Sequence, residues 1–425
     1  MEVVKNAHIQ SLLVPRYLTW FANGLIVWFC ATLISTPFGA GVTQAVLLAA
    51  VLLGGYWLWK YRSNVFHDTQ WVLIGLFLAA ALNAFLSVYH GFNIRMLHQP
   101  ALLSVCILAI GLWVLLKPSS NTLWVAMGVG AIAACSLALY QLLVQHNPRP
   151  NGWHNAILFG DIAMVLGLML IAGVIASFEQ KQSIWLKMFL LIGVLSGITA
   201  SLLSGSRGGW LALVLCFIPL YLYTRSWKLM GTALVSIATL VAIVFVTPQT
   251  RMRDRLIEVQ HNLQEYKNGN AMTSIGARIE MSRAGLMVWL DNPLLGVGNP
   301  QFQQKLLALI ETGKIQKIPV IEGDYKDTHN EITDAAAKGG ILGLLVILLL
   351  YGVPLSYFLR ILKGNHAQAR PIALSGALLV FATIDFGLSV NIFTRHIGKA
   401  YYFIFLSILI GLCSSAMSRP QALPK

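Results

Sequence analysis

Long apolar segments alternate with short polar ones along the chain, and one long polar segment interrupts the series. A helix needs about 20 apolar residues to cross a bilayer. The apolar segments are near that length, so the pattern predicts twelve membrane-spanning helices. They lie near residues 17–36, 40–58, 70–89, 97–116, 122–144, 155–177, 185–203, 209–225, 227–247, 330–359, 370–388 and 397–417. The first segment is long and lacks a small-residue cleavage site, which favours a span over a cleavable signal peptide.

The long polar segment, residues 248–328, shows helical patterns of its own. Apolar residues at helical spacing over 251–263, with arginines on other faces, predict an amphipathic helix on the membrane surface. Two more helices are expected over 275–290 and 301–311, with a tight turn at 296–300 between them. We therefore expect one integral domain, with spans one to nine in 1–247, an external helical insert in 248–328, and spans ten to twelve in 329–425.

Composition and charge agree with an all-α polytopic membrane protein. Hydrophobic residues make up 57% of the chain and charged residues 11%, against about 25% charged residues in soluble domains. Short loops and tails on one side carry fourteen Lys and Arg residues, and short loops on the other side carry five. Positive residues accumulate on the cytoplasmic side, so both termini are expected inside and the insert outside. The net charge of +14 thus reflects topology and does not indicate a nucleic-acid partner.

Cysteine and histidine positions indicate neither a disulfide framework nor a metal site. All five cysteines fall within predicted spans and none lies in the insert. No cluster of cysteine and histidine has the spacing of metal ligands. We expect no metal and no cofactor.

The junction between the seventh and eighth predicted spans reads Ser204-Gly-Ser206-Arg207-Gly208-Gly. Its glycines allow the backbone to approach a ligand closely, and Ser206 or Gly208 can cap the following helix, whose N-terminus favours anions. The guanidinium of Arg207 presents a fork of donors suited to phosphate oxygens. An arginine anchored to lipid headgroups is the alternative, and the Ser-Arg-Gly-Gly setting favours a ligand.

Two arginines of the insert lie in the predicted helix 275–290. Arg278 and Arg283 are five residues apart and therefore point about 140° apart on an ideal helix. Arg278 shares a face with Ser282 near the helix start, where it can face a site. A surface pair with a glutamate is the simpler interpretation for Arg283, and substrate binding is its alternative role.

A histidine stands where the insert re-enters the membrane, in Asp327-Thr-His329-Asn330. Asp327 or Thr328 is expected to cap the tenth span, which would place His329 in its first turn. A histidine can pass a proton near neutral pH or bind phosphate as imidazolium. The helix dipole disfavours the charged form in a first turn, so a neutral, basic ring is expected. The alternative is a histidine that only solvates the loop end.

Two further basic residues are candidates for substrate binding. Lys338 falls inside the tenth predicted span, where a charge needs a partner or a polar cavity. Asp161 and Asp385 from other spans are its candidate partners. Arg395 stands before the twelfth span on the outer side and can add to a cationic rim, with headgroup anchoring as the alternative.

These motifs, in this order, resemble the O-antigen ligase and polymerase superfamily of bacterial envelope enzymes. The ordered set is Ser-Gly-Ser-Arg207-Gly-Gly, then Gly-Ala-Arg278 leading to Trp289-Leu-Asp-Asn-Pro-Leu-Leu-Gly-Val-Gly298, then His329-Asn330 before Gly340-Ile-Leu-Gly343. The resemblance covers most of the chain and is strongest over 200–345. The last spacing and the chain length look more like the ligases than the polymerases.

The resemblance implies a glycosyltransferase of the C-type fold, with a large periplasmic loop between helices nine and ten. Such ligases move O-antigen polysaccharide from undecaprenyl pyrophosphate to a sugar hydroxyl of lipid A–core at the outer face of the bacterial inner membrane. No metal or nucleotide takes part, and direct displacement inverts the anomeric centre. Arg207 and Arg278 would then hold the pyrophosphate, and His329, beside Asn330, would be the base or a phosphate ligand.

Three other functions remain open. A polymerase extending the chain on the same lipid carrier would need nearly the same site, and so would an oligosaccharyltransferase acting on protein serine or threonine. A twelve-span transporter or flippase belongs to another class. The sequence shows no duplicated halves and no paired broken helices, and its candidate intramembrane acids are only Asp161, Asp334 and Asp385. The oligomeric state also remains open.

Overall fold

The computed structural model describes residues 15–91, 96–206, 208–246, 252–318 and 327–418. Regular structure in these ranges is entirely helical. Beside a short 3-10 turn at His67–Thr69, the α-helices are α2 (Arg16–Thr32), α3 (Gly39–Lys60), α4 (Arg62–Val65), α5 (Gln70–Tyr89), α6 (His98–Leu116), α7 (Ser120–Leu143), α8 (Ala156–Glu179), α9 (Ile184–Ser204), α10 (Gly208–Leu215), α11 (Phe217–Thr224), α12 (Trp227–Val246), α13 (Met252–Lys267), α14 (Ser274–Asp291), α15 (Gly298–Glu311), α16 (Glu331–Lys363), α17 (Ala369–Gly387) and α18 (His396–Met417).

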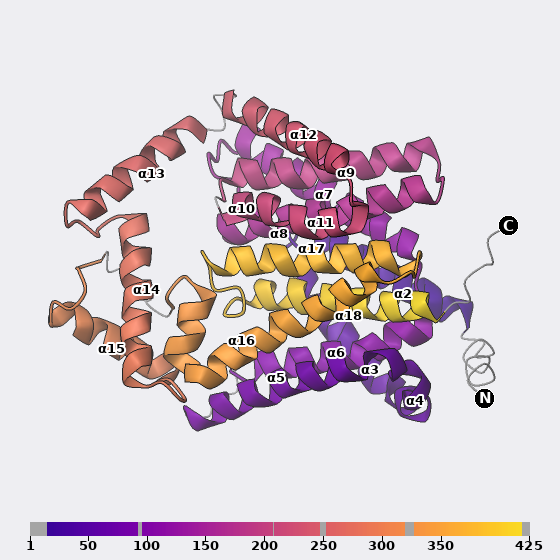
Figure 1. Cartoon of the computed structure of the whole chain (residues 1–425), viewed down its shortest axis with the longest axis horizontal. Helices are drawn as coiled ribbons and strands as arrows, with labels where there is room; N and C mark the ends of the chain where they lie inside the picture. Colours follow the sequence, from indigo (N-terminus) through magenta and orange to yellow (C-terminus); the bar gives the residue numbers. More distant parts are fainter. Residues whose placement is uncertain (1–14, 92–95, 207, 247–251, 319–326, 419–425) are drawn as a thin grey trace.

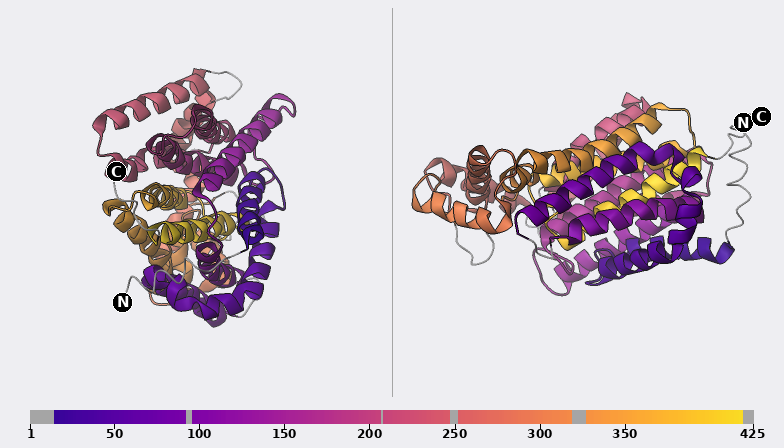
Figure 2. Two further views of the ribbon diagram at one scale, coloured as in Figure 1. Left: turned by 90° about the vertical axis from the view of Figure 1, so that its right-hand side faces the viewer. Right: turned by 90° about the horizontal axis from the view of Figure 1, so that it is seen from below.

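The long helices form one bundle, and the insert helices α13–α15 project from one end of it (Figures 1 and 2). We call this the insert end. The start of α2 and the end of α18 lie at the opposite end. Helices α8, α17 and α18 form the centre, since 83% of the most apolar 18-residue stretch of each is buried. Large apolar rings such as Phe159, Phe386 and Phe405 fill this core without solvent exposure.

The prediction of an all-helical multi-pass membrane protein is confirmed. Within the described ranges, nine helices are long and apolar enough to cross a membrane. Helix α2 has 17 residues, and the predicted span 209–225 consists of the two short helices α10 and α11. Helix α12 follows the ninth predicted span closely. The count of twelve crossings therefore stays a prediction, as do the orientation in the membrane and the division into an integral domain and an insert.

Helix α16 is two segments joined at Gly340, whose φ of 59° and ψ of −148° are not helical. The short first segment runs beside α14, at a steep angle to the long second segment (Figure 1). The turn after α14 fits into the break: the N–H of Ile341 donates to the Pro293 carbonyl at 2.8 Å. A Cβ on Gly340 would lie 2.4 Å from the Leu294 carbonyl carbon. Only glycine accommodates both this backbone and this approach.

This break changes the expected position of Lys338. The sequence pattern placed Lys338 inside a membrane span, whereas it belongs to the short segment that lies against α14. Lys338 precedes the break, so it does not belong to the long apolar segment that follows Gly340. Lys338 thus lies before the break within the candidate span Glu331–Lys363, and its placement inside the membrane stays a prediction.

The insert has a small apolar core of its own. Val288 of α14, Phe302 of α15 and Ile315 are buried together with Ala337 of α16. The last of these residues ties the insert core to the short segment of α16. The helices expected at 275–290 and 301–311 are confirmed as α14 and α15, and α13 is a helix as well. Its placement on a membrane surface stays a prediction.

Candidate functional site at the insert end

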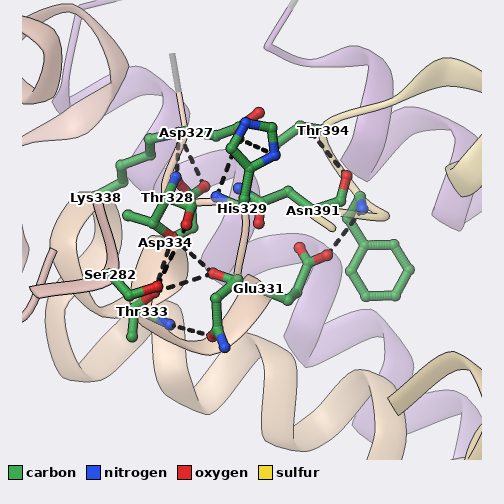
Figure 3. Close-up of polar contacts among 12 residues, drawn as sticks. Ser282, Asp327, Thr328, His329, Glu331, Thr333, Asp334, Lys338, Asn391 and Thr394 are labelled. Carbon is green, nitrogen blue, oxygen red and sulfur yellow. Dashed lines mark hydrogen bonds and ion pairs between the residues drawn. The ribbon is translucent and has the colours of Figure 1, made fainter. Parts of the chain in front are cut away.

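His329 lies just before the start of α16 (Figure 3). Asn330 is the N-cap, and its side-chain oxygen accepts the N–H groups of Ile332 at 3.0 Å and Thr333 at 3.1 Å. The cap side chain also donates to the Leu388 carbonyl at 3.2 Å, which fixes this turn to the loop after α17. The expectation that Asp327 or Thr328 caps the helix is therefore wrong. His329 precedes the cap with a left-handed φ of 53° and does not lie in the first turn.

Asp327 links His329 to Arg395. Its Oδ1 lies 3.7 Å from His329 Nδ1 and accepts the His329 N–H at 3.2 Å. Its Oδ2 lies 3.7 Å from Arg395 Nη2. The Asp327 side chain is 7% exposed and that of His329 is 26% exposed, so a buried carboxylate holds a histidine that a substrate can reach. Arg395, 45% exposed, is thus part of the His329 network.

Thr328 is fully buried next to His329 in the chain and connects the start of α16 to α14. Its N–H donates to Asp334 Oδ1 at 3.1 Å, and its hydroxyl donates to the Asn330 carbonyl at 2.8 Å. Ser282 of α14 donates its hydroxyl to the Thr328 carbonyl at 3.4 Å. The face of α14 that carries Ser282 therefore turns towards the His329 loop. Arg278, one turn earlier on that face, is directed towards the same end of the bundle.

The junction between α9 and α10 meets α8 at a buried carboxylate. Ser206 donates its hydroxyl to Asp161 Oδ1 at 2.5 Å, and both residues are at most 1% exposed. A Cβ on Gly208 would lie 2.6 Å from the Ser389 hydroxyl, so the loop after α17 packs on this junction. Arg278 interacts electrostatically with Asp161. Arg207 lies outside the described residues, and its role stays a sequence-based prediction.

The structure thus joins two motifs that are far apart in the sequence. Arg278 of the insert interacts with the carboxylate that binds Ser206, and the loop 388–395 lies between this carboxylate and His329. Positively charged groups and hydroxyls here can bind a phosphate, and a histidine held by a carboxylate can take a proton.

Two of the predicted binding residues have structural partners instead. Arg283 is 52% exposed and lies 3.8 Å from the buried Glu280, so it forms the arginine–glutamate pair that the sequence suggested, although only the arginine is at the surface. Lys338 Nζ lies 2.7 Å from Asp334 Oδ1 and sits over the Phe302 ring at 5.4 Å. The partner of Lys338 is therefore on its own helix and is neither Asp161 nor Asp385. Binding of substrate by these two residues stays a prediction.

Glu280 organises the insert. It is fully buried, accepts the Tyr266 hydroxyl at 2.8 Å, and accepts the Gln316 N–H at 3.1 Å. Burial and the hydrogen bond to Glu280 raise the pKa of Tyr266, so the phenol stays protonated and continues to donate this bond.

Sequence reasoning missed two buried polar residues at the site. Glu331 is 5% exposed and accepts the Phe393 N–H at 3.2 Å. Asn391 is 1% exposed, and within the described part of the chain neither its side-chain oxygen nor its nitrogen has a hydrogen-bond partner. Buried amide groups without partners are uncommon, so Asn391 has unused hydrogen-bonding capacity beside the site (Figure 3). An asparagine in a short loop between two predicted spans was the available signal.

Fold and site together define a multi-pass membrane protein whose polar chemistry is concentrated at one end of an apolar helical bundle. Residues 192–348, from α9 through α16, match the family model described as O-antigen ligase. This segment contains Ser206, Arg278 and His329. The resemblance to the O-antigen ligase superfamily is therefore confirmed.

Two proteins illustrate the range of similarity. The chain is 24% identical to an uncharacterized protein of Haemophilus influenzae over 91% of this chain and 97% of that protein. It is 25% identical over 130 residues to the O-antigen ligase of Escherichia coli K12, a match that covers 30% of each chain. The first match extends over most of both chains, and the second concerns only a segment.

Proposed function

We propose that this chain is a glycosyltransferase that moves O-antigen polysaccharide from undecaprenyl pyrophosphate to a sugar hydroxyl of lipid A–core. The reaction would take place at the periplasmic face of the bacterial inner membrane, with both chain termini in the cytoplasm. The match to the O-antigen ligase family supports ligase or polymerase chemistry, and the partial similarity to the Escherichia coli O-antigen ligase favours the ligase.

The observation that carries the proposal is the position of His329. It lies at the insert end, where Asp327 lies 3.7 Å from its Nδ1 and Arg395 lies 3.7 Å from the same carboxylate group. A carboxylate on the Nδ1 side orients the ring and stabilises the imidazolium that forms when Nε2 accepts a proton. Both proposed substrates are anchored in lipid, so a site at the end of a membrane bundle is where they can meet.

In the proposed reaction, the acceptor hydroxyl oxygen attacks the anomeric carbon of the donor sugar. His329 takes the hydroxyl proton, and the bond from the anomeric carbon to the pyrophosphate oxygen breaks with its electron pair on that oxygen. The leaving group gains negative charge as this bond breaks, and fixed positive charges from Arg278, and from Arg207 as the sequence predicts, lower the barrier. Direct displacement inverts the anomeric centre. A histidine base contributes about 10²–10⁴-fold to such a rate.

The decisive assay uses purified full-length protein in detergent, with polymer-loaded undecaprenyl pyrophosphate and lipid A–core separated on a gel. Wild type should form a ladder of lipid A–core joined to polymer, and His329→Ala should reduce ladder formation at least about 100-fold. His261→Ala is the matched control, because His261 is an exposed histidine of the insert helix α13. It should leave the ladder unchanged.

Other outcomes of the assay identify the alternatives. Growth of the donor polymer without a ladder would replace the ligase with a polymerase. Transfer to an added serine- or threonine-containing protein would indicate an oligosaccharyltransferase. If wild type changes neither lipid, the transferase proposal fails, and movement of the lipid-linked sugar across vesicles becomes the activity to measure.

A further inference from the structure

A second polar cluster lies at the insert end, outside the site described above. We define the histidine cluster as His98, His154, His396 and Lys399, together with Gln44. The rings of His98 and His396 have centroids 5.1 Å apart, and His396 Nε2 lies 3.0 Å from Gln44 Oε1. His154 interacts electrostatically with His396, and Lys399 with His98. Four segments that are far apart in the sequence thus meet here, and three of them contribute basic side chains.

Helix N-termini converge on this cluster. His98 is the first residue of α6, and His396 is the first residue of α18. His154 lies two residues before the start of α8 at Ala156, and Gln44 lies in the second turn of α3. The N-terminal end of a helix carries partial positive charge and unpaired N–H groups, which favour an anion. The helix N-termini and the basic side chains therefore both contribute positive charge to this surface.

The described neighbours of the histidines do not neutralise them. The electrostatic partners of His98, His154 and His396 are each other or Lys399. The acid that acts on Lys399 is Glu331, which already accepts the Phe393 N–H. Burial, and then the charge of His396, lower the pKa of His154. An anion would remove this repulsion between like charges.

Two buried atoms of the cluster also lack partners. Within the described residues, His154 Nε2 and Gln44 Nε2 are buried and have no hydrogen-bond partner. The amide nitrogen of Gln44 is a donor, and His154 Nε2 is a donor in the charged ring. Buried donors without partners are uncommon and point to a group that is missing. In the same described part of the chain, no group of three or more His, Cys, Asp and Glu side chains can hold a metal ion.

We propose that the histidine cluster binds a phosphate group carried by a lipid in the outer leaflet of the membrane that the protein spans. His396 is exposed, whereas His98, His154 and Lys399 are half-buried, so a headgroup can reach the cluster from the surface. Arg395 is adjacent in sequence to His396 and pairs with Asp327 beside His329. The phosphate site thus borders the candidate catalytic site but uses none of its residues.

Two lipids can supply this phosphate. One is the phosphorylated lipid A–core acceptor, an assignment that rests on the proposed function and would place the cluster on the acceptor side of the reaction. The other is an anionic membrane phospholipid. The site itself does not depend on turnover, so binding can be measured separately from transfer.

The test measures binding to full-length protein in phosphatidylcholine nanodiscs by native mass spectrometry. The probes are lipid A–core with its phosphates, the same lipid after enzymatic dephosphorylation, and phosphatidylglycerol. The variant combines His98→Gln, His154→Gln and His396→Gln, and His261→Gln on α13 is the matched control. Because charge-assisted hydrogen bonds are the strong ones, the triple variant should bind its phosphorylated ligand about tenfold more weakly than wild type. Binding of dephosphorylated lipid A–core should not change.

The arms identify the source of the phosphate. A loss confined to phosphorylated lipid A–core assigns the cluster to the acceptor, and a loss confined to phosphatidylglycerol assigns it to membrane phospholipid. Wild-type affinity for every phosphorylated lipid, in a triple variant that melts at the wild-type temperature, would overturn the proposal. If the triple variant does not fold, the single variant His396→Gln at the exposed position is measured instead. Its affinity for the phosphorylated lipid should fall about threefold, and unchanged affinity would contradict the proposal. A chain inactive in transfer that still shows these binding losses would refute the ligase and keep the phosphate site.

Discussion

The two ends of the helical bundle use charged side chains in opposite ways. At the end opposite the insert, cations lie over aromatic rings near the surface: Lys60, Arg62, Lys187, Arg360 and Arg370. At the insert end and in the insert, carboxylates are buried: Asp161, Glu280, Asp327, Glu331, Asp334 and Asp385. Within the described residues, no carboxylate is buried at the opposite end.

This difference separates anchoring from chemistry. A cation over an aromatic ring at a helix end is typical of membrane interfaces and contributes about 0.5–1 kcal/mol at exposed sites. A buried carboxylate is costly unless basic groups or hydrogen bonds accompany it. At the insert end the accompanying groups include His329, Arg395, Ser206 and Lys338. We therefore propose that the insert end carries the reaction and that the opposite end anchors the bundle in lipid.

The largest effect on transfer is expected at Arg278, and Arg283 of the same helix serves as its control. Arg278→Ala should lower transfer at least about 100-fold, because a fixed donor to the developing negative charge is lost. Arg283→Ala should stay within about twofold of wild type, because the half-exposed Arg283 pairs with Glu280 of the insert. The lipid A–core ladder measures both. Arg278→Lys should rescue poorly if the fork geometry of arginine matters. Equal activity of the two alanine variants would remove Arg278 from the site.

The next effect concerns stability and two glycines, Gly340 within α16 and Gly364 at its C-cap. Gly340→Ala should lower the melting temperature strongly, because the φ of 59° and the approach to Leu294 exclude a Cβ. Left-handed backbone alone costs a non-glycine residue about 1–3 kcal/mol. Gly364→Ala, at the opposite end of the same helix, is the control, since its Cβ would meet atoms at 3.4 Å or beyond. Thermal unfolding in detergent compares them, and equal melting temperatures would show that the break at Gly340 is not required.

A smaller effect is expected when Asp327 loses its charge. Asp327→Asn keeps the size of the side chain but weakens its hold on His329 and Arg395, and transfer should fall about tenfold, as expected for one charge-assisted contact. Asp291→Asn is the control, because Asp291 is exposed at the end of α14. Transfer rates with saturating donor measure the difference. Wild-type rates for Asp327→Asn would mean that His329 does not depend on this carboxylate.

The smallest effect is expected at the opposite end. Arg62→Ala removes a guanidinium whose central carbon lies 4.1 Å from the Trp59 ring centroid. Stability should fall by less than about 1 kcal/mol, and transfer should stay within about twofold of wild type. Thermal unfolding and the ladder assay check both values. A tenfold loss of transfer in a stable Arg62→Ala variant would contradict the division between the two ends.

Much of the helical structure could be predicted from the sequence because it depends on local patterns of apolar and polar residues. Long apolar runs indicated the membrane helices, since any helix of that length and composition is stable in a bilayer without specific partners. The helical periodicity of the insert predicted α14 and α15 for the same reason. The order of the arginine, glycine and histidine motifs was enough to show the resemblance to the superfamily, and residues 192–348 match the O-antigen ligase family model.

Tertiary structure alone decided how the site is assembled. The break at Gly340 depends on the turn at Pro293 fitting into it, so hydropathy could not predict that the helix containing Lys338 changes direction there. Asn330 and not Asp327 caps α16, because Asp327 is held by contacts to His329 and Arg395 from two different segments. The histidine cluster joins segments up to 352 residues apart, as between Gln44 and His396. Contacts at such separations leave no local pattern in the sequence, because they depend on how the helices pack.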